Sequence, residues 1–392
     1  MSLPGAAQAA TINLPRILRV GAGASQQLAA SLTELGLERP LLVTDPFMVE
    51  CGYCSRLEEQ LGVAGIDYGL FADCVPDPTT DSVYAALASL RQDDYDCLVA
   101  LGGGSSLDTA KAVGVLATHG GIMRDYKVPA AVDSGLPVIA IPTTAGTGSE
   151  ATRAAVITDT DTGEKMLCMG LGLMPVAALA DYELTLSMPY RLTADTGIDS
   201  LCHAMEAYVS RRANPFTDGM ALSAMRALCA NIRTACAEPG NRPAREAMML
   251  AATQGGIAFS NASVTLIHGM SRPIGALFHV PHGLSNAMLL PEVTAWSVTG
   301  DPARYAHCAR CMGMAGEGDS DGLALEKLVA GLRQLNADLS VPGPRAYGIE
   351  ERAWFDSLEL MAEQALASGS PHNNPRIPGA PEIVELYQRV WG

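Results

Sequence analysis

The first half of this chain alternates short, uninterrupted apolar runs with segments of helical spacing. Residues 41–44, 97–101 and 137–141 are apolar runs ended by Asp, Gly or Thr, as expected of strands buried on both faces of a parallel sheet. Neighbouring segments such as residues 25–35 and 82–91 have the spacing of helices. The alternation predicts βαβ units whose ligand lies beyond the carboxyl ends of the strands.

Long helical runs replace the strands after about residue 187. They cover residues 193–210, 216–236, 242–260, 321–335 and 351–368. A chain of 392 residues is long enough for two domains and a large core. We therefore predict an α/β dinucleotide-binding domain over residues 1–186, with a parallel sheet flanked by helices, and an all-α domain over residues 187–392.

Charge and hydropathy exclude several classes of protein. Hydrophobic residues make up 48% of the chain and charged residues 17%, which is typical of a globular protein. A net charge of −16 argues against nucleic acid as a partner. No apolar run approaches the ~18–20 residues of a membrane span, and the stretch before Thr11 lacks the basic and apolar regions of an export signal. With ten cysteines, we therefore expect a cytoplasmic protein with free thiols.

Four residues of the second half have the character of a metal site. Asp199 and His203 are four apart in a predicted helix, so their side chains share one face. His268 and His282 supply two further imidazoles. One carboxylate and three imidazoles suit iron(II) or zinc better than calcium or magnesium. A single buried histidine is usually a core residue, so the prediction depends on all four together.

A glycine-rich turn marks a candidate phosphate site. Residues 102–106 follow a predicted strand and open a helix that we expect to begin near Leu107. Glycines allow close approach of the backbone, and a helix N-terminus offers free N–H groups to an anion. Such a corner can also be purely structural. The turn therefore indicates, without proving, a pyrophosphate cradle.

Polar residues follow two other predicted strands. Asp45 ends the run at residues 41–44, where a carboxylate accepts hydrogen bonds from an adenosine ribose and repels a 2′-phosphate. Asp45 therefore favours NAD over NADP, unless it only caps the next turn. Thr143, Thr144 and Thr147 lie past the run at residues 137–141, where they could bond phosphate or ribose or simply form a turn.

Several ordered motifs resemble the iron-containing (group III) alcohol dehydrogenase family over nearly the whole chain. The matching segments are residues 101–112, 141–150, 156–159 with 165–166, 199–203, 268–275, 281–287, 374–376 and 382–387. The resemblance implies a dehydroquinate synthase-like architecture, with the cofactor and the metal meeting in a cleft between the domains. It also implies iron(II) as the ion, with zinc as the other candidate, and homodimers or larger assemblies.

The same resemblance implies the residues that contact NAD. They are Gly103, Gly104, Ser105, Asp108, Thr143, Thr144, Thr147, Thr152 and Lys165, together with Asp45. The ammonium of Lys165 would meet a ribose or the nicotinamide side. The chain departs from the family at Asp77, where relatives usually carry Asn, and the added negative charge should also disfavour a phosphorylated ribose.

The sharpest departure is Arg272, because many relatives carry His at this position. Arginine cannot act as a base near neutral pH. Our hypothesis is that Arg272 pairs with an anionic group of the substrate, and the alternative is an interdomain or subunit salt bridge. His279 is interpreted as a lining or proton-relay residue rather than a spare ligand. Phe259 is expected to wall the substrate pocket, although core packing is nearly as plausible.

These motifs predict a metal-dependent alcohol dehydrogenase or aldehyde reductase that transfers hydride between NAD(H) and a small alcohol or aldehyde. The metal would bind the substrate oxygen and stabilise an alkoxide. The alternative is a hydroxyacid–oxoacid transhydrogenase that retains its nicotinamide cofactor and shuttles hydride between two substrates. A lyase of the dehydroquinate synthase type and a non-catalytic metal protein fit the motifs less well.

Overall fold

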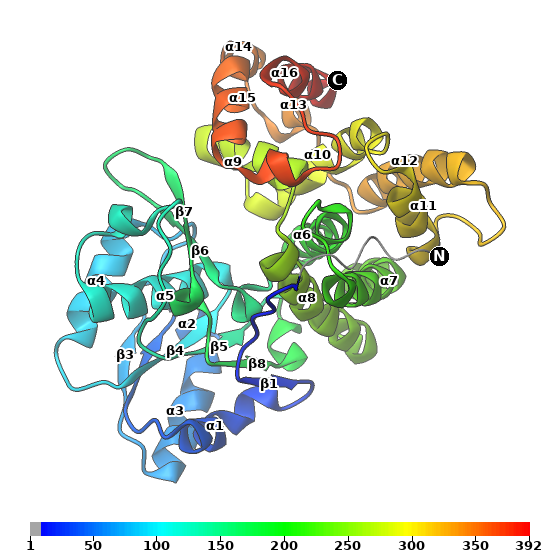
Figure 1. Ribbon diagram of the computed structural model, residues 1–392. Helices are drawn as coiled ribbons and strands as arrows, with labels where there is room; N and C mark the ends of the chain where they lie inside the picture. Colours follow the sequence, from blue (N-terminus) through cyan, green and yellow to red (C-terminus); the bar gives the residue numbers. More distant parts are fainter. Residues whose placement is uncertain (1–8) are drawn as a thin grey trace.

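The computed structural model describes residues 9–392, which form a sheet-containing part and a helical part (Figure 1). Residues 1–8, which belong to the stretch examined for an export signal, lie outside the described residues. Six parallel strands form one sheet in the order β1-β8-β5-β4-β2-β3. Their bounds are Ile17–Val20 (β1), Pro40–Val43 (β2), Gly69–Phe71 (β3), Cys97–Gly102 (β4), Val138–Pro142 (β5) and Ala177–Ala180 (β8).

Helices cover both faces of this sheet, and this explains the unbroken apolar runs. Val99 of β4 packs on one face in a cluster with Leu28 and Leu57, while its neighbour Leu98 packs on the other face with Val83 and Leu107. The helices of this part are α1 (Leu28–Leu35), α2 (Pro46–Glu50), α3 (Tyr53–Ala64), α4 (Thr80–Leu90) and α5 (Gly104–His119). Short 3₁₀ turns lie at Ala24–Gln27 (η1), Met123–Tyr126 (η2), Ser149–Ala151 (η3), Leu171–Leu173 (η4) and Tyr182–Thr185 (η5).

The strand order reverses between β2 and β4. From β2 the chain moves outward to β3, then returns to place β4 on the other side of β2 and continues to β5. Asp45 follows β2 and the glycine turn follows β4, so both stand at this crevice. In open α/β sheets ligands bind at such a switch point, beyond the carboxyl ends of the strands.

A two-stranded antiparallel hairpin, formed by β6 (Ala154–Thr158) and β7 (Lys165–Met169), was not predicted. Its residues alternate between buried and half-buried, unlike the wholly buried strands of the sheet. The hairpin is joined to the loop before α4, since the Thr158 amide donates to the Pro78 carbonyl at 2.7 Å. Lys165 is the first residue of β7.

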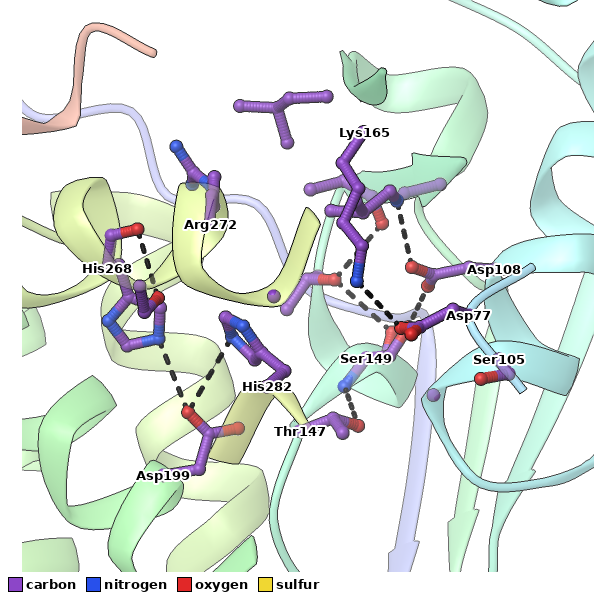
Figure 2. Close-up of a pocket in the computed structure, with 18 of the residues that line it drawn as sticks. Asp77, Ser105, Asp108, Thr147, Ser149, Lys165, Asp199, His268, Arg272 and His282 are labelled. Atoms are coloured by element: carbon purple, nitrogen blue, oxygen red, sulfur yellow. Dashed lines mark hydrogen bonds and ion pairs between the residues drawn. The ribbon is translucent and has the colours of Figure 1, made fainter. Parts of the chain in front are cut away.

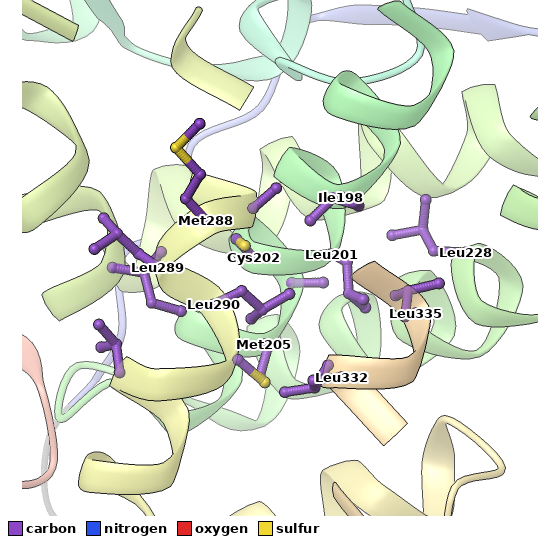
Figure 3. Close-up of a cluster of buried hydrophobic side chains, with 14 of the residues drawn as sticks. Ile198, Leu201, Cys202, Met205, Leu228, Met288, Leu289, Leu290, Leu332 and Leu335 are labelled. Carbon is purple, nitrogen blue, oxygen red and sulfur yellow. The ribbon is translucent and has the colours of Figure 1, made fainter. Parts of the chain in front are cut away.

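The helical part is organised around α6 (Tyr190–Val209), which packs against α7 (Pro215–Ala237), α8 (Arg242–Ala262) and α10 (His282–Ser297). Figure 3 shows Leu201 and Met205 of α6 among Leu290 of α10 and Leu332 of α12 (Asp321–Asp338). The other elements are α9 (Leu266–Phe278), α11 (Pro302–Cys311), α12 (Asp321–Asp338), α13 (Pro344–Tyr347), α14 (Glu351–Asp356), α15 (Leu358–Ala367), η6 (Ser370–Asn373) and α16 (Ala380–Trp391).

The predicted fold class is confirmed, with differences at the ends of elements. The run at residues 351–368 is two helices, α14 and α15, rather than one, and α5 begins at Gly104 rather than near Leu107. The division expected after residue 186 falls between η5 and α6. All ten cysteines are free thiols. Within residues 9–392, no helix has the length and apolarity needed to cross a membrane.

We expect Leu201→Ala to lower the free energy of unfolding by about 2–5 kcal/mol, because it leaves a cavity where α6, α10 and α12 meet. Leu201 is 1% exposed. Leu323→Ala in α12 is the matched control, since Leu323 is 41% exposed and its loss should cost less than ~0.5 kcal/mol. Urea unfolding of the two variants measures the difference, and equal values would contradict this account of the core.

Candidate active site

Three helices bring the four predicted ligands together. α6 supplies Asp199 and His203, α9 supplies His268 and α10 supplies His282, and one ligand atom from each lies within 4.8 Å of all the others. The Nε2 atoms lie 3.4 Å (His268), 3.8 Å (His203) and 3.8 Å (His282) from the Asp199 Oδ1. Figure 2 shows His268 and His282 directed at this carboxylate. The three imidazoles therefore converge on one oxygen.

Close packing at Gly283 allows this convergence. A Cβ at Gly283 would stand 2.5 Å from the Asp195 carbonyl oxygen and 3.4 Å from the Asp199 Cβ. Any side chain at this position would therefore push the start of α10 away from α6, and His282 with it. Glycine directly after His282 is a geometric requirement of the cluster.

A buried carboxylate orients His268. Glu206, also on α6, is 1% exposed, and its Oε2 lies 2.6 Å from the His268 Nδ1. Its Oε1 accepts hydrogen bonds from the Thr265 hydroxyl (2.8 Å) and the Ile267 amide (2.6 Å). A histidine that donates through Nδ1 keeps Nε2 free for a metal. Burial opposes a charge on His268, but Glu206 and Asp199 outweigh it and raise the pKa of His268 to about 9.

Asn286 and Phe259 complete the surroundings of the cluster. The Asn286 Nδ2, one turn after His282, donates to the Asp199 Oδ1 at 2.7 Å. The Phe259 ring stacks on the His203 ring with centroids 4.2 Å apart. The side chains of Asp199, His203 and His268 are 3–5% exposed, whereas His282 is 43% exposed. The cluster is therefore closed except on the side of His282.

The donor set fits one divalent ion. Burial lowers the pKa of His203 to about 3, which leaves its imidazole neutral and able to donate a lone pair. Burial also acts against the charge of Asp199, yet the three imidazoles hold the pKa of this carboxyl well below its usual range. One anionic oxygen and three imidazole nitrogens, held this close in a buried site, match the ligands of iron(II) or zinc, and an ion bound here would displace the proton from the His268 Nε2.

A cavity of about 210 Å³ adjoins the open side of the cluster. Besides the cluster it is lined by Asp77, Phe259, Arg272 and Lys165. A second cavity, of about 600 Å³, is lined by Asp45, Gly103, Thr143 and Thr144 at the crevice of the sheet. Gly104, Ser105 and Thr147 line both cavities. An elongated ligand in the second cavity would therefore reach the cluster past the glycine turn.

The turn before α5 requires its glycines. Gly102 has φ +149°, and a Cβ there would meet the Ser106 Oγ at 2.5 Å. The open N-terminus of α5 faces the region where the two cavities meet. Asp45 performs the capping role considered above, because its Oδ1 accepts from the Met48 amide at 3.1 Å, and its carboxylate also lines the second cavity. The two interpretations of Asp45 are therefore compatible.

Asp108 and Thr152 line the first cavity but are held by a buried lysine that was not predicted to matter. Lys111 is 0% exposed and donates to the carbonyl and hydroxyl oxygens of Ser149 (2.6 and 2.7 Å) and Thr152 (3.2 and 3.1 Å), and to the Ala154 carbonyl (3.0 Å). Asp108 accepts from the Ser149 hydroxyl at 2.6 Å. Both residues therefore shape the loop between β5 and β6.

Arg272 and His279 differ in their position relative to the first cavity, which Arg272 lines and His279 does not. Arg272 lines the first cavity, donates to the Ser370 hydroxyl at 3.0 Å, and has no carboxylate partner within the described residues (Figure 2). Burial lowers the pKa of its guanidinium. His279 is the exposed residue that ends α9, with φ +54°, and it lines neither cavity. The fold does not bring His279 to the cluster.

Comparisons with known proteins show the family of this chain. Residues 15–182 match the iron-containing alcohol dehydrogenases, and residues 193–391 match the C-terminal part of the Fe-containing alcohol dehydrogenase family. The NAD-dependent methanol dehydrogenase of Bacillus methanolicus is 35% identical over 379 residues, which cover 96% of this chain and 98% of that protein. The chain belongs to the iron-containing alcohol dehydrogenase family. It is an oxidoreductase acting on CH–OH groups.

Two solved structures illustrate the likeness. A 1,3-propanediol oxidoreductase superimposes with a TM-score of 0.93 at 34% identity, covering 98% of this chain and 100% of that one. The sulfoacetaldehyde reductase of Bifidobacterium kashiwanohense, solved in complex with NAD⁺, has a TM-score of 0.87 at 27% identity, covering 98% and 99%.

Glu206→Gln should weaken metal binding about 10- to 100-fold, because the neutral amide no longer fixes the orientation of His268. The metal retained against a graded chelator, measured by mass spectrometry, gives the affinity. Glu363→Gln, at an exposed position of α15, is the control and should leave the affinity unchanged. Equal retention in both variants would show that Glu206 does not support the site.

Proposed function

We propose that the chain is an NAD-dependent, metal-dependent alcohol dehydrogenase or aldehyde reductase for a small substrate. One observation carries the proposal: the four-residue cluster opens onto a cavity that shares Gly104, Ser105 and Thr147 with the larger cavity at the sheet crevice. A dinucleotide held at the crevice would thereby present its reactive end to an alcohol at the cluster. The family to which the chain belongs supports the same reaction.

Asp199, His203, His268 and His282 would hold the ion, for which we propose iron(II), and the same donors also accept zinc. An ion bound there would polarise the oxygen of a carbonyl or alcohol. The surrounding residues keep the donors in place, since Glu206 orients His268 and Asn286 holds Asp199. The Phe259 ring covers His203 and excludes water from that side.

The crevice residues would hold the cofactor. The N-terminus of α5, with Gly103, Gly104 and Ser105, would take the pyrophosphate. Asp45 would bind the adenosine ribose and repel a 2′-phosphate, which supports NAD rather than NADP. The buried Thr144 hydroxyl has no hydrogen-bond partner within the described chain and borders this cavity, so it is free to bond a ligand.

Proton transfer has no obvious base in the first cavity. Its only histidines are members of the cluster, and His279 is outside it. Arg272 cannot lose its proton near neutral pH, even though burial lowers its pKa. We propose that the alcohol proton leaves through water or the ribose hydroxyls. The transhydrogenase alternative gains no support from the relatives described above, and a cofactor retained through gel filtration would be needed to favour it.

Removing the metal should abolish turnover. Protein purified without oxygen and loaded with iron(II) should oxidise NADH with small aldehydes, and NADPH should be a poor substitute. Treatment with a chelator should lower kcat/KM at least about 100-fold, because no protein group replaces the ion as an electrophile. Iron(II) should restore the rate. A rate that survives complete metal removal would refute the proposed chemistry.

The substrate that best fits this cavity carries an anionic group, and we propose this as a narrower substrate class. Arg272 presents a half-buried guanidinium to the same cavity as the cluster, and its one hydrogen bond within the described residues is to a neutral hydroxyl. An unpaired charge that is partly removed from water is costly, whereas a bidentate bond to carboxylate or sulfonate offsets the cost. Of the two alternatives considered, an interdomain salt bridge is not present in the described residues, and a salt bridge to a second subunit stays an alternative. One structural relative is named for an anionic aldehyde, sulfoacetaldehyde.

Arg272→His should reduce kcat/KM for anionic aldehydes such as sulfoacetaldehyde about 10- to 100-fold relative to neutral aldehydes, because the paired charge contributes roughly 1.5–3 kcal/mol. The ratio of the two kcat/KM values is the measured quantity. Arg352→His, at a 92% exposed position of α14, is the control. An unchanged ratio would remove Arg272 from substrate recognition.

We also propose a homo-oligomer in the cytoplasm. β1 is an edge strand, so one side of its backbone has no neighbour in the sheet, and its Leu18 and Val20 are 42% and 39% exposed. A second copy pairing along this edge would cover both. Ten free thiols suit a reducing compartment. Light scattering with size exclusion measures the assembly, and a monomer at micromolar concentration would contradict it.

A further inference from the structure

An ion pair in the first cavity has no role in the function proposed so far. The Asp77 Oδ1 lies 3.0 Å from the Lys165 Nζ, and both residues line the cavity that contains the metal cluster (Figure 2). Asp77 belongs to the loop between β3 and α4, and Lys165 begins β7 of the hairpin. The pair thus joins two segments that are 88 residues apart in the sequence, at one wall of the cavity.

Among residues 9–392, Asp77 is the one group that forms an ion pair with Lys165. Within the described residues, the ammonium makes no other hydrogen bond or ion pair, although its side chain is only 15% exposed. It also stands close to the helical part, since a Cβ at Gly275 of α9 would lie 3.5 Å from the Nζ. An ammonium has three donors, so two remain for a ligand in the cavity.

The loop that carries Asp77 is fixed to the hairpin that carries Lys165. The Thr158 amide donates to the Pro78 carbonyl at 2.7 Å, and the hydroxyls of Thr80 and Thr160 are 2.9 Å apart. Asp77 itself has φ +52°, a left-handed conformation that Asp and Asn tolerate better than most residues. These contacts therefore hold the backbone of Asp77 beside Lys165, and the Asp77 side chain, which is 62% exposed, reaches the ammonium from there.

The other charged side chains of the cavity determine how the Asp77–Lys165 pair affects its net charge. Asp199 belongs to the metal cluster, and Asp108 lies 3.8 Å from the Lys111 ammonium. Apart from these, the charged side chains that line the cavity are Asp77, Lys165 and Arg272. With Asp77 present, the charge of Lys165 is balanced and one cation remains. Without it, two cations face the cavity.

We propose that Asp77 positions Lys165 and sets the preference of the enzyme between oxidised and reduced cofactor. The inference rests on the proposed function, because hydride transfer places the nicotinamide ring in this cavity, next to an alcohol at the cluster. The ring is a cation in NAD⁺ and neutral in NADH. Unbalanced positive charge in the cavity weakens the binding of NAD⁺ and leaves the binding of NADH unchanged. Asp77 balances that charge and so prevents the loss of affinity for NAD⁺.

Two variants test the sign of the effect. Asp77→Asn keeps the shape and the left-handed conformation but leaves Lys165 unbalanced, so Kd(NAD⁺)/Kd(NADH) should rise about 3- to 10-fold. Lys165→Met leaves the carboxylate unbalanced, so the same ratio should fall. The double variant should return toward the wild-type ratio, because both charges are gone. Each Kd is measured by isothermal titration on the metal-loaded protein without substrate, so the result does not depend on turnover.

Asp81→Asn, at an exposed position of α4, is the matched control and should leave the ratio unchanged. The wild-type ratio in Asp77→Asn, or equal changes in both Kd values, would overturn the inference, since the carboxylate would then act only on structure. A wild-type protein that binds neither form of the cofactor would overturn the proposed function, and the inference with it. Binding of both forms with opposite shifts in the two single variants supports the inference.

Discussion

The rest of the site depends on the burial of one carboxylate among three imidazoles. A charge at the Asp199 position, 2% exposed, would be expensive in a helical core without compensation. The imidazoles and the Asn286 amide supply that compensation, and the proposed ion would supply more. α6, α9 and α10 must therefore pack closely enough to share this oxygen, and Gly283 allows them to do so. The position of the substrate cavity, on the side of His282, follows from this packing.

The sheet and the helical part contribute different chemistry. The switch between β2 and β4 gathers Asp45, the glycine turn and a helix N-terminus at one edge, where the proposed cofactor would place its anionic and ribose groups. The helical part contributes the metal donors and the two side chains, Phe259 and Arg272, that give the substrate cavity an apolar wall and a charged one. Lys111 links these regions indirectly, because it fixes the loop that borders both cavities.

Much of this could be predicted from the sequence, for identifiable reasons. Strands buried on both faces and long amphipathic helices have strong patterns, and the fold class followed from them. The four donors were found because Asp199 and His203 have helical spacing and because all four lie in motifs that resemble the family. The hairpin β6–β7 was missed because a short, half-buried ribbon has a weak pattern. Glu206 lies just beyond the motif at residues 199–203, and its position seven residues after Asp199, two turns along the same helix, was the available signal.

Other features of the site could not be predicted from the sequence and became visible only in the three-dimensional fold. The proximity of Asp77 to Lys165 and the absence of a partner for Arg272 depend on segments distant in sequence. The unequal exposure of the four donors is another such feature, and it has a kinetic consequence. Since His282 is the only one of the four donors that faces solvent, the proposed ion would leave, and oxygen or a chelator would arrive, through the same opening by which the proposed substrate would enter. A bound cofactor and alcohol would therefore block this opening, which would slow metal exchange and protect iron(II) from oxidation during turnover.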